Sequence, residues 1–208
     1  MREDTSYLLS TLQVVTSPEA QNIPVEELEA KILREQPRWY NYLEKQTELL
    51  HEAISIFKSY DKKNKLRKFW DQLLRGNPHL DNNVFDTLFQ LAQNAYDNGV
   101  LQDAHKMLSF VSTYYPRNIS AYILLGNVIQ QLYGYDEAQG FYKNVTALFS
   151  DPTLFLLAAE NEMQLQHEEE AIAYLQKAKT NLESRNLSEI ETELSKHVDD
   201  LLVSMQPS

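Results

Sequence analysis

Small residues recur in pairs through the second half of this chain, and the two members of each pair are twelve positions apart. Successive pairs are offset by 34 and then 33 residues. Two antiparallel helices can approach closely only where the facing side chains are small, so each pair predicts one helical hairpin. The pairs are Ala92 with Ala104, Gly126 with Ala138, and Ala159 with Ala171.

Large apolar residues stand at fixed offsets from these small ones, as the core positions of two packed helices require. Turn residues occur between the proposed helices, at Asp97-Asn98-Gly99 and at Tyr133-Gly134, and prolines stand only at boundaries, at Pro116 and Pro152. The predicted first-helix core residues are Leu88, Leu91, Tyr122, Leu125, Phe155 and Ala158; the second-helix ones are Leu108, Val111, Tyr142, Val145, Leu175 and Ala178.

The period and the small-residue signature resemble those of tetratricopeptide repeats, over residues 83–182. That resemblance implies an all-α fold of three helical hairpins forming a right-handed superhelix. Five positions depart from the repeat pattern. Ala95, Ile129 and Glu162 replace the aromatic residue expected three places after the small one, and Ser150 and Glu183 replace the closing proline. A capping box at Ser188-Glu189-Ile190-Glu191 predicts one more helix, which covers the end of the stack. Its predicted apolar stripe is Ile190, Leu194, His197 or Val198, and Leu201.

Composition agrees with an all-helical chain. Of its 208 residues 43% are hydrophobic, only 5 are glycine and 7 proline, and none is cysteine. The absence of cysteine excludes disulfides, and the Met1-Arg2-Glu3-Asp4 start lacks the basic and apolar segments of a signal peptide, so we expect a cytoplasmic protein. We also expect no membrane insertion.

A net charge of −11 argues against nucleic acid as a partner. A basic cluster at Lys62-Lys63-Asn64-Lys65 and Arg67-Lys68 lies near Asp61 and Asp71, and its expected role is a solvated helix face.

Three regions are predicted. Residues 1–80 form a helical extension, ended by Arg75-Gly76-Asn77-Pro78, with a role in self-association or in covering the repeats. Within it, Trp39, Tyr40 and Tyr42 are expected in a core or an interface. Residues 81–182 hold the three repeats, and residues 183–208 hold the final helix and tail.

Motifs for catalysis or metal binding are missing. The five histidines are dispersed, and His167-Glu168-Glu169-Glu170 is interpreted as a helix start with acids that favour the helix dipole. No phosphate-binding glycine loop and no nucleophile-turn motif occurs in the sequence. We therefore expect no catalytic residues, no metal site and no enzyme.

The candidate site is the face formed by the first helices of the hairpins. A large apolar residue begins each set, and Gln or Asn beside it can bond the backbone of an extended peptide. The alternative is that the three apolar residues pack against the N-terminal helices. The predicted peptide-binding groove residues are Phe89, Gln93, Tyr96, Ile123, Asn127, Gln130, Leu156, Glu160 and Met163. None is Lys or Arg, which disfavours carboxylate-gripping co-chaperones.

The repeats also resemble those of the class II chaperones of bacterial type III secretion, the SycD or LcrH type. The resemblance lies in the run from Leu88 to Gly99, in Asp103-Ala104-His105-Lys106, in Tyr135-Asp136-Glu137-Ala138 and in Ala158-Ala159-Glu160. It implies a chaperone in the bacterial cytoplasm that holds an extended apolar segment of a translocator or effector before export, with no cofactor and with a homodimer as one assembly. Phe89, Ile123 and Leu156 would be its pocket floors. The alternative is an adaptor that joins folded proteins through its convex face or N-terminal helices.

Overall fold

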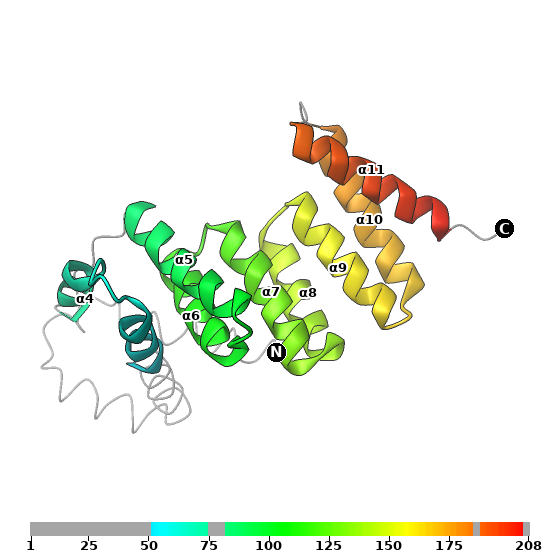
Figure 1. Ribbon diagram of the computed structural model, residues 1–208. Helices are drawn as coiled ribbons and strands as arrows, with labels where there is room; N and C mark the ends of the chain where they lie inside the picture. The colour runs from blue at the N-terminus through cyan, green and yellow to red at the C-terminus, as the bar shows by residue number, and fades with distance from the viewer. Residues whose placement is uncertain (1–50, 75–81, 185–187, 206–208) are drawn as a thin grey trace, which may run out of the picture. The chain divides into compact units, whose positions relative to one another are not determined.

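A computed structural model describes residues 51–74, 82–184 and 188–205 (Figure 1). The chain divides into two compact units, residues 1–52 and residues 53–208. Residues 1–50 of the predicted helical extension, which include Trp39, Tyr40 and Tyr42, lie outside the described residues. No strand occurs within these three ranges, which confirms the all-α prediction.

Three helical hairpins follow one another, as the repeat predicts. α5 (Asn82–Asp97) pairs with α6 (Leu101–Tyr114), α7 (Ile119–Tyr133) with α8 (Tyr135–Leu148), and α9 (Pro152–Gln164) with α10 (Glu168–Glu183). α5 also contacts α7, and α7 contacts α9, so the first helices of the hairpins lie side by side (Figure 1). α11 (Glu189–Ser204) packs on α10.

The small residues lie where the helices of each hairpin cross. Their side chains are fully buried, and Gly126 is buried as well. The second-helix core positions are also buried, which confirms the packing pattern, whereas Leu91 and Tyr122 of the first helices are only half-buried. The fully buried small residues are Ala92, Ala104, Ala138, Ala159 and Ala171.

Local sequence signals set the ends of these helices. Gly99 and Gly134 have φ values of 73° and 89°, the left-handed region that a residue without a Cβ adopts readily. Gly134 both ends α7 and begins α8. Asp151 accepts hydrogen bonds from the amides of Thr153 and Leu154 and so caps α9, which starts with proline.

Two further helical segments precede the hairpins in the second unit. Residues 51–60 are helical, and α4 (Arg67–Leu74) follows after a short turn. Trp70 of α4 packs against Phe57, with ring centroids 5.7 Å apart, and against Phe110 of α6 at 5.8 Å. The two segments are therefore joined to the first hairpin through an aromatic cluster.

Candidate functional site

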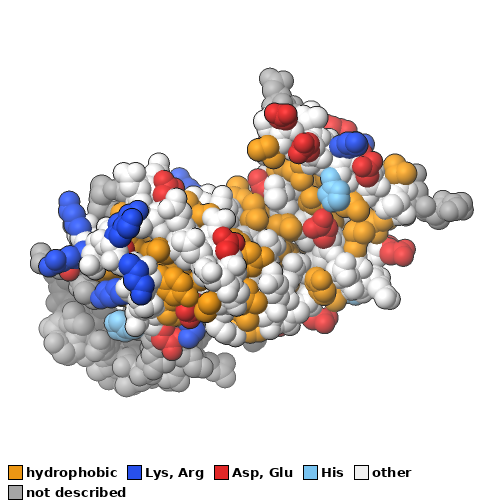
Figure 2. Space-filling model, viewed as in Figure 1, with side chains coloured by type: hydrophobic (Ala, Val, Ile, Leu, Met, Phe, Trp, Pro, Cys, Tyr) orange, Lys and Arg blue, Asp and Glu red, His pale blue; other side chains and the backbone are white. Residues whose placement is uncertain are grey.

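We call the surface carried by α5, α7 and α9 the first-helix face. Hydrophobic side chains appear between polar ones over these helices in Figure 2. Of the nine predicted groove residues, Gln93 is exposed, Leu156 is buried, and the other seven are half-buried. The half-buried ones are Phe89, Tyr96, Ile123, Asn127, Gln130, Glu160 and Met163.

Phe89 lies at the start of the face. Its ring stacks on Phe85, with centroids 5.6 Å apart and planes 14° apart, and Phe85 in turn meets Tyr115 edge-on. Phe85 is 8% exposed and anchors the pair, while Phe89 keeps part of its surface accessible. An aromatic ring that packs on a buried neighbour and keeps part of its surface accessible can bind an apolar group with little loss of side-chain entropy.

Polar side chains link the neighbouring first helices. Tyr96 Oη accepts a hydrogen bond from Gln131 Nε2 at 2.7 Å, and Gln130 Nε2 donates to Asn161 Oδ1 at 3.0 Å. Asn161 is 1% exposed and also donates from Nδ2 to the backbone carbonyl of Tyr135. These bonds hold α5 to α7, and α7 to α9, so the face is fixed before any partner arrives.

Leu156 does not share the exposure of Phe89 and Ile123. It is 6% exposed and belongs to a cluster with Phe155, Leu175 and Val198 of α11. Nε2 of His197, also on α11, lies 3.4 Å from Glu160 Oε1. The final helix therefore covers Leu156 in the third hairpin, whereas Glu160 and Met163 of the same helix stay half-buried.

The stripe predicted on α11 is only partly correct. Val198 takes the buried position and His197 is exposed, which decides between the two residues that the sequence left open. Leu194 and Leu201 pack against the cluster, whereas Ile190 is 79% exposed. The capping box is formed, with the Ser188 hydroxyl accepting from the Glu191 amide and the Glu191 carboxylate accepting from the Ser188 amide.

Glu162 stands where the repeat pattern expects an aromatic residue, and the structure explains the departure. Its carboxylate is 5% exposed and accepts a hydrogen bond from Gln139 Nε2 at 2.9 Å. His167 Nδ1 lies 2.8 Å from the same oxygen. A buried acid with two such partners joins the start of α8 to the turn after α9, which is a structural role.

Asn161 and Gln131 are site residues that the sequence reasoning did not single out, and His197 was considered only for the apolar stripe of α11. The only local signal for Asn161 was an amide between two acids, Glu160 and Glu162, just after Ala158 and Ala159. Its partners come from two other helices, so no local pattern could identify them. No group of three or more His, Asp or Glu side chains suited to a metal ion occurs in the described parts of the chain.

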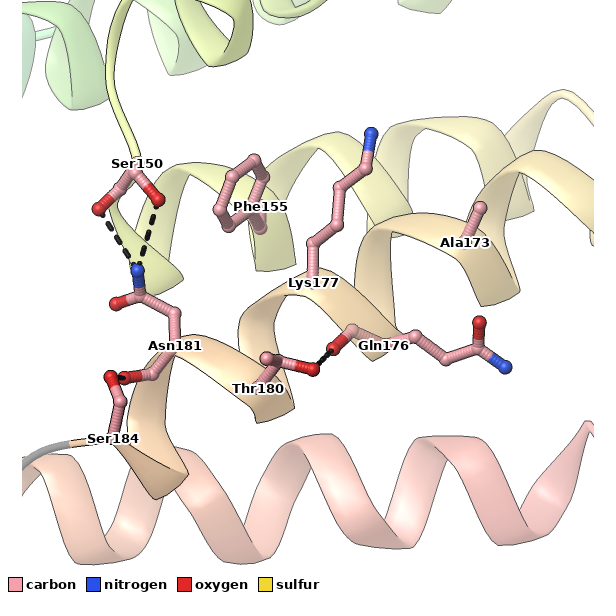
Figure 3. A pocket seen from close by; sticks show the side chains of 8 residues that line it. All are labelled: Ser150, Phe155, Ala173, Gln176, Lys177, Thr180, Asn181 and Ser184. Carbon is pink, nitrogen blue, oxygen red and sulfur yellow. Dashed lines mark hydrogen bonds between the residues drawn. The ribbon is translucent and has the colours of Figure 1, made fainter.

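A separate hollow of about 550 Å³ is lined mainly by α10, with Phe155 of α9 and Ser150 of the segment before it (Figure 3). Asn181 Nδ2 donates to the carbonyl and to the hydroxyl oxygen of Ser150, and these bonds close one end of the hollow. Its lining residues are Ser150, Phe155, Ala173, Gln176, Lys177, Thr180, Asn181 and Ser184.

Consecutive helical hairpins, small crossing residues and a shared first-helix face give the chain a tetratricopeptide-like fold. Among solved structures, the chain is similar to PcrH from Pseudomonas aeruginosa, with 20% identity and a TM-score of 0.54 over 61% of this chain and 95% of that one. It is also similar to the translocator chaperone SycD of Yersinia enterocolitica type III secretion, with 24% identity and a TM-score of 0.54 over 64% of this chain and 96% of that one.

SycD in complex with a peptide of the translocator YopD matches with 25% identity and a TM-score of 0.52, over 60% of this chain and 94% of that one. The suspected likeness to SycD-type chaperones is thus confirmed at the level of the fold. No protein-family profile matches the chain, and no curated protein matches its sequence. No helix in the described ranges has the length and apolar character needed to cross a bilayer.

Proposed function

We propose that this protein is a chaperone for translocator-type clients of type III secretion and that it holds an extended apolar segment of the client on its first-helix face. One observation supports the proposal most directly. Nearly all of SycD matches this chain, both in the structure of SycD alone and in its complex with a translocator peptide. The role is one of binding rather than catalysis, since SycD is a chaperone.

Phe89 and Ile123 are the proposed apolar contacts for the client. Both are half-buried, and they occupy equivalent positions in consecutive first helices. Burying one such side chain against a client contributes about 1.5–3 kcal/mol, so two of them make sequestration competitive with client aggregation. Asn127 is half-buried on α7 and supplies an amide that can bond the client backbone.

Leu156 enters the proposal in a different way. In the structure it is buried in a cluster with Val198 of α11, so a client contact at Leu156 forms only if α11 shifts. The proposed resting site therefore extends over α5 and α7, and α11 marks its end.

The decisive experiment is a titration of the purified protein with a translocator from the same organism. The Phe89→Glu/Ile123→Glu variant should weaken binding by at least about 100-fold, because two apolar contacts are lost. The matched control is Leu148→Glu/Ile190→Glu, which makes the same kind of change at side chains that are 74% and 79% exposed. Equal affinity of both variants and the unchanged protein would disprove the site, provided that their circular dichroism is the same.

An adaptor that joins folded proteins is the second candidate, and the hollow between α10 and the segment before α9 favours it (Figure 3). Co-expression separates the two functions. A chaperone keeps an otherwise insoluble translocator in solution, whereas an adaptor leaves its solubility unchanged. SycD occurs in an alternative dimer, so we further propose self-association of this chain, to be checked by light scattering.

A further inference from the structure

Six basic side chains gather in the eleven residues that lead from the helix at 51–60 into α4. All six are exposed, and we call this segment the basic turn. Five are lysines and one is an arginine. They are Lys58, Lys62, Lys63, Lys65, Arg67 and Lys68.

The one acid within the basic turn faces inward. Asp61 is 7% exposed, and its carboxylate accepts hydrogen bonds from the backbone amides of Lys65 at 2.9 Å and Leu66 at 2.8 Å. The sequence placed the basic cluster near Asp61 and Asp71 on a solvated helix face. In the structure the Asp61 oxygens bind the backbone, so the solvent-facing side of the turn is formed by cations.

The basic turn rests on a rigid support. Leu66 is 1% exposed, and Phe69 and Trp70 pack against Phe110 of α6 with ring centroids 6.4 and 5.8 Å apart. Tyr60 donates a hydrogen bond to Asp103 of α6 at 3.1 Å, which also joins the turn to α6. The cations are therefore presented on a preformed surface and need no folding step to act together.

Asp71 of α4 is an exposed acid just after the basic turn, but cations outnumber acids in this part of the chain. Figure 2 shows Lys and Arg gathered around α4, and Asp and Glu spread over α10 and α11. Interactions between exposed charges fade over about 8 Å at physiological ionic strength. The net charge of −11 is thus no measure of the potential at the basic turn, which is set by its own side chains.

We propose that the basic turn is a docking surface for the anionic headgroups of a lipid bilayer. Clusters of 4–8 lysines and arginines are of the size that binds acidic lipids, and lysine suits a fluid array of charges because it acts as a mobile point charge. No large apolar side chain is exposed in residues 51–73, so the contact stays at the surface. Stacking on nucleic-acid bases is disfavoured, because Phe57, Phe69 and Trp70 are buried.

The test is sedimentation of the full-length protein with vesicles of phosphatidylcholine containing 30% phosphatidylglycerol. Binding is expected to these vesicles, to be absent with phosphatidylcholine alone, and to disappear in 0.5 M salt. Lys62→Gln/Lys63→Gln should weaken it roughly 30-fold, the loss expected for two surface lysines. The matched control is Lys143→Gln/Lys196→Gln, at two exposed lysines on α8 and α11, and it should change binding less than twofold.

Three results would overturn the proposal. One is equal weakening by both variant pairs, and another is binding to neutral vesicles or to neither kind. The third is evidence that the cations bind another ligand. Either inorganic phosphate at constant ionic strength displaces the protein from the vesicles, or the protein binds a 20-base-pair DNA duplex more tightly than the vesicles. Because the vesicles carry no client, these results are independent of the proposed chaperone function.

Discussion

The Tyr142 ring of α8 packs directly against the backbone of Gly126 in α7. A Cβ atom placed on Gly126 would lie 2.6 Å from the Tyr142 hydroxyl oxygen and 2.8 Å from two ring carbons. The other two hairpins use a different pair at the equivalent positions, Ala92 with Leu108 and Ala159 with Leu175. The larger side chain and the missing Cβ in the second hairpin therefore compensate for each other.

Gly126→Ala should lower the free energy of unfolding by about 1–3 kcal/mol, as overpacked cores do. The double variant Gly126→Ala/Tyr142→Leu recreates the pair of the first and third hairpins, and it should recover stability to within about 1 kcal/mol of the unchanged protein. Urea denaturation followed by circular dichroism measures both values. Additive losses in the double variant would show that the two residues are not coupled.

Tyr142 also predicts a response to alkaline pH. Burial raises the pKa of its phenol far above the ordinary value of 10.0, and the nearby Glu160 and Tyr96 raise it further. Because the pKa is higher in the folded state, the Tyr142 phenol of the unfolded chain ionises first. The stability that the neutral, buried phenol contributes is therefore complete below pH 10 and declines as the pH rises above it. Tyr142→Phe should lose less stability than the unchanged protein between pH 9 and pH 11, as measured by urea denaturation.

The same variant tests a buried hydroxyl. Tyr142 Oη has no hydrogen-bond partner among the described residues. Since a buried unpaired hydroxyl costs about 1–3 kcal/mol, Tyr142→Phe should leave stability at pH 7 unchanged or increase it. A loss of more than about 1 kcal/mol at pH 7 would indicate that the hydroxyl has a bonding role.

Asn161 should be a strong contributor to stability. Asn161→Ala removes bonds to Gln130 and to the Tyr135 carbonyl in a buried place, and we expect a loss of about 1–3 kcal/mol in the free energy of unfolding. Asn94 occupies the equivalent position of the first hairpin and is exposed, so Asn94→Ala is the control and should change stability by less than about 0.5 kcal/mol. Similar losses in both variants would contradict the assigned role.

Leu156 and Ile123 should separate stability from client binding. Leu156→Ala opens a cavity beneath α11 and should cost about 2–5 kcal/mol of stability, with a small effect on client affinity. Ile123→Ala should cost about 1 kcal/mol of stability and weaken client binding about tenfold. Denaturation and a client titration of the two purified variants provide the comparison, and the reverse pattern would place the client on the third hairpin.

Much of the fold could be predicted from periodicity alone. Ala104, Ala138 and Ala171 mark helix crossings because a close approach allows only small side chains, and this requirement repeats with the hairpin. The turn at Gly134 and the capping box at Ser188 are likewise local, since each depends on residues within a few positions.

The candidate site was only partly predictable. Periodicity placed Phe89, Ile123 and Leu156 on one face, but it assigned them equal exposure. The structure buries Leu156 under Val198, which is 42 residues away in the sequence, and this distinction needs the packing of α11. The spacing that defines a repeat carries no information about what lies over its last copy.

The order of helices, their crossing points and their caps were determined by the sequence itself, because these features arise from interactions within one hairpin. The tertiary structure alone decided which half of the first-helix face stays open, that Asp61 turns inward beneath its basic neighbours, and that Gly126 accommodates the Tyr142 ring. Each of these depends on side chains from different elements competing for the same space or the same hydrogen bond, and only packing in three dimensions resolves that competition.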